Sequence, residues 1–143
     1  MVSGWGMHDE EMTVAGVRAL AWLRSIQRSA DGYFAPVGSN GFYVRGEAKA
    51  EFDQQPVDAY ASVSAYGQAA RVTGKRAWLD DARQAFDWFL GQNQKQLALY
   101  DPATGGCRDG LHADRTNENQ GAESTLSYLL ALTELRAMER HPA

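Results

Sequence analysis

The chain has 143 residues, of which 44% are hydrophobic and 22% charged, and its formal net charge is −4 at pH 7. These values are typical of a single soluble globular domain that buries a core. The negative charge and the scattered basic residues argue against a nucleic-acid partner, and the lack of an apolar run of about 20 residues argues against a membrane-spanning segment.

The cysteine content and the first residues of the chain favour a cytoplasmic protein. Cys107 is the only cysteine, which excludes an internal disulfide and argues against a structural metal site. Asp9, Glu10 and Glu11 stand where an export signal would need an apolar segment. We therefore expect a cytoplasmic location, with no metal and no other cofactor.

Hydrophobic periodicity predicts an all-α chain with four main helices. A glycine-rich lead-in, residues 1–8, is expected to be flexible. The helices that follow it are expected over residues 9–28, 56–73, 75–92 and 121–140. Residues 9–143 then form a single domain.

The four predicted helices are of two kinds. The first and third are amphipathic, and Trp22, Trp78 and Trp88 fall on their apolar stripes, where we expect them in the core. The second and fourth contain uncharged runs, Ala59–Ala70 and Ser124–Thr133, which are typical of helices packed on all sides. The chain therefore alternates outer and inner helices.

Two long loops precede the inner helices, over about residues 30–55 and 93–120. In the first loop, aromatic and β-branched residues flank Asn40-Gly41, which favours a tight turn and at most a small two-stranded ribbon. Loops of this length in a compact domain are usually functional. The four aromatic side chains of this loop are candidates for stacking on a sugar ring: Tyr33, Phe34, Phe42 and Tyr43.

The chain contains an internal repeat with a period of 66 residues, with halves at about residues 9–74 and 75–140. The shift aligns Ala19 with Ala85, Trp22 with Trp88, Asp53 with Asn119, and Gln54 with Gln120. Each half is an outer–inner helical hairpin, and the only inner-to-outer connection is the short turn at Thr73-Gly74. In an antiparallel array, both long loops and the N-termini of both inner helices then lie at one end, where a binding cleft is expected.

Several segments resemble a known family: FDQQPVDAY, WFLGQN, YDPATGGCRDGL and NENQGAESTLSYLLAL. They are similar to the C-terminal part of the six-hairpin glycosidase-like toroids, and more narrowly to a helical domain appended to some bacterial glycosyltransferases of the retaining, two-Rossmann class. The resemblance covers about residues 9–135. It implies an α/α-toroid fold and a role in carbohydrate binding or processing.

The same resemblance implies further hairpins. A full toroid has six hairpins, whereas this chain supplies two and contains no nucleotide-sugar-binding Rossmann motif. The rest of the ring would come from a larger protein or from a homo-oligomer of three copies. In several members of the superfamily a carboxylate just before the last inner helix is the general acid, which implies Glu118 or Glu123.

The catalytic candidates are carboxylates at the expected cleft end: Glu123, Asp58 and Glu118. Hydrolysis of a glycoside usually needs two carboxyl groups, about 5–5.5 Å apart for retention and about 6.5–9.5 Å apart for inversion. Asp58 and Glu123 also suit the first turn of a helix, where a carboxylate stabilises the helix without any catalytic role.

The substrate-binding candidates are polar or aromatic groups of the two loops: Tyr43, Asp53, Gln54, Gln55, Arg108, Asp109, His112, Asn117, Asn119 and Gln120. Structural alternatives exist for several of them. Gln54 and Gln55 could bond the loop to its helix, Arg108 and Asp109 could form an ion pair, and Asn119 could cap the last helix.

Three functional hypotheses follow from the sequence. The first is a carbohydrate-binding or carbohydrate-processing domain associated with glycosyl transfer or glycoside hydrolysis, and whether it is an enzyme stays open. The second is a non-catalytic scaffold or oligomerisation domain of a glycosyltransferase-type protein. The third, an isomerase on a related toroid, would need a set of histidines near the cleft, where only His112 is present.

Overall fold

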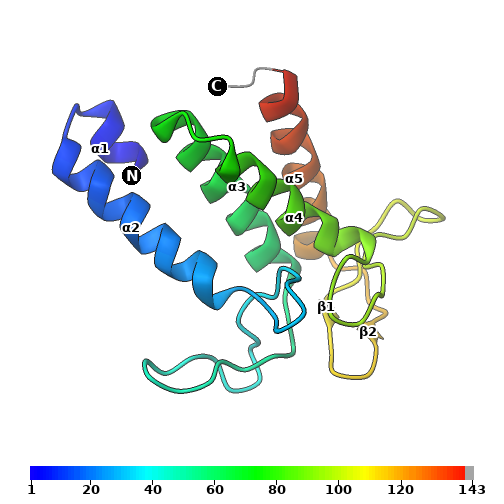
Figure 1. The fold of residues 1–143 in the computed structure, drawn as a ribbon. Helices are drawn as coiled ribbons and strands as arrows, with labels where there is room; N and C mark the ends of the chain where they lie inside the picture. Colours follow the sequence, from blue (N-terminus) through cyan, green and yellow to red (C-terminus); the bar gives the residue numbers. More distant parts are fainter. Residues whose placement is uncertain (141–143) are drawn as a thin grey trace.

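The protein, seen in a computed structural model, is mostly helical (Figure 1). The structure describes residues 1–140, so the end of the predicted domain, residues 141–143, lies outside the described part. The helices are α1 (Val2–Gly6), α2 (Glu10–Ile26), α3 (Pro56–Thr73), α4 (Ala77–Asp87), the 3-10 helix η1 (Trp88–Leu90) and α5 (Ala122–Arg140). Two short antiparallel strands, β1 (Gly110–Leu111) and β2 (Thr116–Asn117), form the only sheet within residues 1–140.

The predicted all-α class and order of helices are confirmed, and local sequence signals explain the boundaries. Asp9 caps α2, because its side chain accepts the backbone N–H of Met12 at 2.9 Å. Pro56 occupies the first turn of α3, where its missing N–H costs nothing. Gly74 ends α3 in the left-handed conformation (φ 65°), which glycine adopts without strain.

Helix α3 is the centre of the molecule and packs against both α4 and α5. Its small side chains allow this close packing: Ala59, Val63 and Ala69 have no exposed surface, and a Cβ on Gly67 would collide with the side chain of Met138 on α5. The uncharged run of α3 is therefore an inner helix, as predicted.

Helix α2 departs from the prediction. Figure 1 shows α2 diverging from α3, and the two helices make few contacts. Trp78 and Trp88 are buried as expected, at 6% and 0% exposed, but Trp22 is 52% exposed. The prediction of a core position for Trp22 is therefore wrong, because no inner helix within residues 1–140 covers that face of α2.

A buried carboxylate attaches α2 to α4. Asp81 is 6% exposed and pairs with Arg28 at 2.8 Å and with Arg24 at 2.9 Å. The second contact is an ion pair without hydrogen-bond alignment. The guanidinium of Arg24 also lies over the ring of Trp78, 5.4 Å from its centroid. Ion pairs therefore hold α2 against α4, because α2 has little apolar contact with α3.

A second polar contact joins α2 to α3. The buried side-chain oxygen of Gln27 accepts hydrogen bonds from the hydroxyls of Ser62 at 3.2 Å and Tyr66 at 3.3 Å. Burial raises the pKa of Tyr66 to about 12, so its phenol remains a protonated donor at neutral pH.

A short helix forms in the N-terminal segment that was predicted as a flexible lead-in. Residues Val2–Gly6 form α1, which lies against α2. The approach is so close that Gly4 is buried and a Cβ on Gly16 would collide with Met1. Glycine in this segment therefore permits packing rather than flexibility.

The small two-stranded ribbon of the structure forms in the second loop. At Asn40-Gly41, where we expected at most such a ribbon, the chain forms a turn without strands. One hydrogen bond joins the arms flanking that turn, from Phe42 N–H to Gly38 O at 3.1 Å, and the other bonds run to residues 50–53: Gly38 donates to Ala50 O at 2.7 Å and Ser39 to Asp53 O at 3.1 Å. The turn exists, but its arms are held by a segment that follows it in the chain.

We expect Asp81→Asn to lower the free energy of unfolding by about 2 kcal/mol. Loss of one partner of a fully buried pair costs about 3–5 kcal/mol, but Arg24 and Arg28 are 39% and 36% exposed and regain hydration. Urea denaturation measures the change. Asp80→Asn is the matched control: its side chain is 64% exposed, and a change within about 0.5 kcal/mol is expected. Equal losses in the two variants would contradict the role given to Asp81.

Candidate functional site

The two long loops lie at the same end of the helices, as the repeat predicts. In Figure 1 they occupy the lower end of the view, where α3 and α5 begin, while α1 and the end of α5 lie at the upper end. The N-termini of the two inner helices therefore point their partial positive charge toward the loops.

A single backbone pairing joins the two loops. Gln54 and Leu111 exchange two hydrogen bonds, each 3.0 Å long, as an isolated antiparallel bridge. Both side chains have no exposed surface. Because side chains alternate along extended backbone, the neighbouring pair, Asp53 opposite His112, is directed away from the core.

Asp53 and His112 form a carboxylate–imidazole pair at the surface. Asp53 Oδ1 contacts His112 Nδ1, and the two side chains are 32% and 24% exposed. This hydrogen bond is the main cause that lowers the pKa of Asp53 below its usual value, and the charge of Arg115 adds to it. An ionised carboxylate on Nδ1 orients the imidazole and leaves Nε2 as its second polar atom. Nε2 can take part in a hydrogen bond as donor or acceptor, according to the tautomer.

Gln55 lies beside this pair, at the N-cap position of α3. Its Nε2 donates to the backbone oxygen of Asp53 at 3.4 Å, which is a long and weak bond. Gly110 stands opposite Gln55 in the bridge, and a Cβ there would lie 3.1 Å from the backbone oxygen of Gln54. The glycine therefore allows the close backbone approach of the two loops at this bridge.

The structure gives Gln54 a structural role, which corrects its prediction as a sugar-binding residue. Its Oε1 accepts the indole N–H of Trp88 at 2.7 Å, and its Nε2 donates to Glu51 O at 2.8 Å and to Gln94 Oε1 at 2.7 Å. A side chain that is fully buried and satisfied has no group left for a ligand. Gln54 therefore bonds the first loop to η1 and to the second loop, and its side chain makes no bond to α3.

Arg108 holds the second loop together rather than pairing with Asp109. Its guanidinium donates to Glu118 at 3.0 Å and to Ala98 O at 3.2 Å, and it lies 3.7 Å from Asp101. The predicted Arg108–Asp109 ion pair is absent from the ion pairs of residues 1–140.

Glu118 does not have the properties of a general acid. Hydrogen bonds from Thr116 and Arg108 lower its pKa, and its side chain is 72% exposed. A general acid needs a carboxyl that stays protonated near neutral pH. The contacts of Glu118 favour a structural role, and the acid role implied by the resemblance stays a prediction.

The remaining amides and Asp109 shape the entrance to α5. Asp109 accepts the backbone N–H of Gly121 at 2.7 Å, and its own N–H bonds to Asn117 and Asn119 carbonyls at 3.2 and 2.9 Å. Gln120 bonds to Thr104 at 2.6 Å and to Asp101 at 3.0 Å. Asp109, and not Asn119, supplies the side-chain acceptor at the start of α5.

Asp58 and Glu123 both lie in the first turn of an inner helix, one position apart under the 66-residue shift, and their environments differ. Glu123 is exposed at the start of α5. Asp58 is half-buried and lines a cavity of about 340 Å³ between α2 and α3, whose apolar walls include Leu20, Leu23 and Val37. Burial raises the pKa of Asp58, the direction required of a general acid.

The aromatic candidates of the first loop separate in the structure. Phe34 is 3% exposed and belongs to the core, so its prediction as a stacking residue is wrong, whereas Phe42 is 67% exposed. Tyr43 lies beside Trp22, with ring centroids 6.1 Å apart, and both line an open hollow of about 520 Å³ with Arg45. The exposure of Trp22 was not predicted, because Trp22 follows the same helical pattern as its repeat equivalent Trp88, which is buried.

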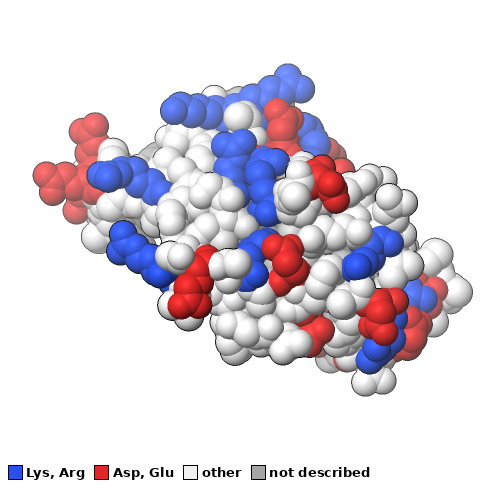
Figure 2. All heavy atoms as spheres, turned by 60° about the horizontal axis from the view of Figure 1, so that its bottom comes forward, with Lys and Arg blue, Asp and Glu red and all other residues white. Residues whose placement is uncertain are grey.

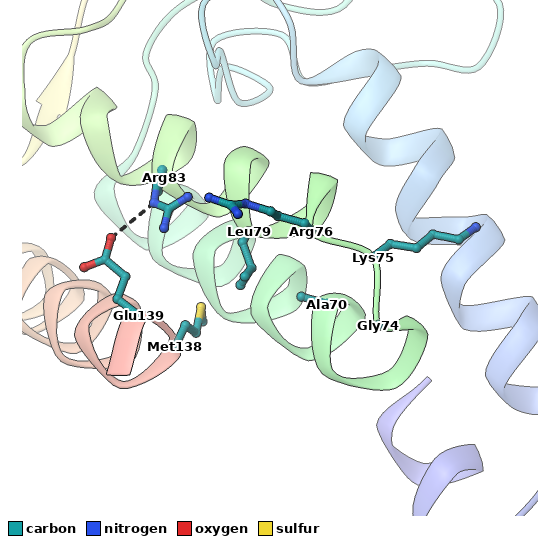
Figure 3. Close-up of a pocket in the computed structure, with 8 residues that line it drawn as sticks. All are labelled: Ala70, Gly74, Lys75, Arg76, Leu79, Arg83, Met138 and Glu139. Atoms are coloured by element: carbon teal, nitrogen blue, oxygen red, sulfur yellow. Dashed lines mark hydrogen bonds and ion pairs between the residues drawn. The ribbon is translucent and has the colours of Figure 1, made fainter. Parts of the chain in front are cut away.

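A hollow of about 290 Å³ at the other end of the molecule contains none of the predicted site residues. Figure 3 shows Arg83 turned toward Glu139 across this hollow, while Lys75 points away from it. Arg83 is engaged by Glu139 and by Asp80, each at 3.1 Å. This end is therefore a weaker candidate than the loop end.

The loop end has mixed charge. Figure 2, turned to bring this end forward, shows acidic and basic side chains next to one another without a continuous area of one sign. Within residues 1–140, no group of three or more His, Cys, Asp or Glu side chains is placed to hold a metal ion. Cys107 has no exposed surface, and burial raises the pKa of its thiol to about 12, so it is not a nucleophile.

No protein-family model matches the chain, and no curated protein is similar to it in sequence. The resemblance to six-hairpin glycosidase-like toroids therefore remains a hypothesis that rests on the short motifs. Among the described residues, no helix is long and apolar enough to cross a membrane.

We expect Gln54→Leu to lower the free energy of unfolding by about 2 kcal/mol, because the buried indole N–H of Trp88 loses its acceptor. Gln55→Leu is the control, and its effect should stay within about 0.5 kcal/mol. Guanidinium denaturation followed by tryptophan fluorescence measures both. A neutral Gln54→Leu would contradict the structural role of this amide.

The free energy of unfolding of Asp58→Asn, minus that of the unmodified protein, should increase as the pH rises from about 4 to 7. A raised pKa in the folded state means that the carboxyl ionises more easily in the unfolded chain, so ionisation favours unfolding over this range. Denaturation curves at several pH values give the difference. Glu123→Gln, at the exposed first turn of α5, is the control. If its stability difference changed more steeply with pH than that of Asp58→Asn, the raised pKa assigned to Asp58 would be wrong.

Proposed function

We propose that the loop end of this protein binds carbohydrate, as a helical domain that serves glycosyl transfer or glycoside hydrolysis. The observation that carries this proposal is the Asp53–His112 pair, which the Gln54–Leu111 bridge holds at the surface. Sugar hydroxyls are both donors and acceptors, and an ionised carboxylate, an imidazole Nε2 and a primary amide offer both kinds of partner.

Three groups provide the proposed contacts. Asp53 and His112 would bind adjacent hydroxyls, and the Gln55 amide beside them would bind a third, since only one weak bond of 3.4 Å engages it. Tyr43, in the same loop, offers a ring face suited to a pyranose. The short motifs shared with sugar-handling toroids support the same ligand class.

For hydrolysis, Asp58 is the favoured acid in this proposal. Burial raises the pKa of Asp58, whereas hydrogen bonds lower the pKa of Glu118. Glu123 is retained as the second carboxyl group because, like Asp58, it is an acidic residue in the first turn of an inner helix. Activity would require the further hairpins of a toroid, from a longer protein or from additional copies, and the expected compartment is the cytoplasm.

A scaffold or oligomerisation domain is the second proposed function. The observation that favours it is the exposure of Leu126, Leu129 and Leu130 on α5, at 56%, 45% and 45%. Apolar side chains grouped in this way are typical of a surface that contacts another protein.

NMR titration with neutral and uronic-acid mono- and disaccharides tests the carbohydrate proposal. A ligand should shift the amide signals of residues 53–55 and 110–112, and His112→Gln should weaken its binding at least about tenfold, the effect of one lost charge-assisted hydrogen bond. Asp114→Asn is the control, because that side chain is 72% exposed and pairs only with Arg115 among the ion pairs of residues 1–140. If no sugar shifts these signals, or if His112→Gln binds unchanged, the proposal fails.

A further inference from the structure

Helix α5 exposes a stripe of leucines along one face. Leu126, Leu129 and Leu130 follow the spacing of neighbours on a helix surface and are each about half exposed. The opposite face of α5 is in the core, where Tyr128 and Ala131 are buried. The stripe therefore belongs to an inner helix that is covered on one side only.

The internal repeat allows the exposed face of α5 to be compared with the equivalent face of α3. A shift of 66 residues places the start of α3 at Pro56 on the start of α5 at Ala122, and it places Val63 on Leu129. Val63 has no exposed surface, whereas its equivalent Leu129 is 45% exposed.

Helix α5 itself covers the equivalent face of α3. One turn before Val63, the hydroxyl of Tyr60 donates to Glu134 of α5 at 3.2 Å. One turn after it, Gly67 lies against Met138 of α5. The face of α3 around Val63 is thus buried by the next inner helix, and the same face of α5 has no next inner helix within residues 1–140.

Helix α2 shows the complementary exposure. Its repeat equivalent α4 packs on the preceding inner helix, α3, and buries Trp78 at 6% and Trp88 at 0% exposed. The equivalent residues of α2, Met12 and Trp22, are 41% and 52% exposed. Within residues 1–140, α2 has no preceding inner helix. It therefore presents the face of an outer helix that is ready to pack on one.

The charges of the two open faces are also complementary. Helix α4 begins directly after the end of α3, so the same arrangement would place the start of α2 at the end of α5. The start of α2 carries Glu10 and Glu11, and α5 ends with Arg136 and Arg140. Acidic side chains would then meet basic ones, and helix N-terminal charge would meet helix C-terminal charge of the favourable sign.

We propose that two copies of this chain associate head to tail, with the α2–α3 hairpin of one copy covering the leucine stripe of α5 on the other. The contact repeats the packing that α4 and α5 make on α3 inside one chain. Because its two faces differ, the contact is heterologous, and each copy keeps one free face for a further copy.

The mass in solution, measured by size-exclusion chromatography with light scattering, tests the proposal. At about 100 μM the full chain should have at least twice the 15.7 kDa mass of one copy. Trp22→Glu and Leu129→Glu should each reduce the mass to that of one chain, because each places a charge in one of the two faces.

Val14→Glu is the matched control. Val14 lies on the same helix as Trp22 and is also exposed, at 48%. Its repeat equivalent is Asp80, whose side chain is 64% exposed on α4, so the control position lies outside the proposed contact. Val14→Glu should therefore keep the mass of the unmodified protein.

Mixing the two disrupted variants separates a head-to-tail contact from a symmetric one. The Trp22→Glu chain keeps a competent α5 face, and the Leu129→Glu chain keeps a competent α2 face, so an equimolar mixture should give a dimer of twice 15.7 kDa. Recovery of this dimer also shows that both variants are folded. An unmodified chain that is monomeric, a Val14→Glu variant that dissociates, or a mixture that stays monomeric would each overturn the proposal.

Discussion

The candidate site depends on one backbone pairing, the two hydrogen bonds between Gln54 and Leu111. This pairing joins the loop before α3 to the loop before α5 and sets the direction of every neighbouring side chain. Gln54 and Leu111 enter the core, and Asp53 and His112 meet at the surface. A shift of one residue in this register would bury the charged pair and expose the amide that holds Trp88.

The interior uses polar groups where apolar contact is insufficient. Gln54 satisfies the indole of Trp88, and Asp81 pairs with two arginines of α2. Both are buried groups with specific partners, so they fix the arrangement of the elements more strictly than apolar side chains would. Such contacts define where α2 and the first loop lie, although α2 shares little surface with α3.

Exposed apolar side chains on α2 and α5 follow from the same architecture. An outer–inner repeat buries each helix against the helix before or after it, and within residues 1–140 α2 lacks a preceding inner helix and α5 lacks a following one. Trp22 and Leu129 lie on these faces, while their repeat equivalents Trp88 and Val63 are buried. The loop end and these faces are formed by different residues, except that Tyr43 of the first loop lies beside Trp22.

The sequence by itself determined the four main helices and their order, although not α1, because the signals are local: the spacing of apolar residues, Pro56 and Gly74 at the ends of α3, and the uncharged runs of the inner helices. It also predicted that both loops meet at one end. Tertiary structure decided which loop residues reach the surface, since the register of Gln54 depends on Leu111 in the other half of the chain. It also decided that Trp22 is exposed and Trp88 buried, although the local sequence patterns of the two are alike. Burial depends on whether an inner helix is present to cover the residue.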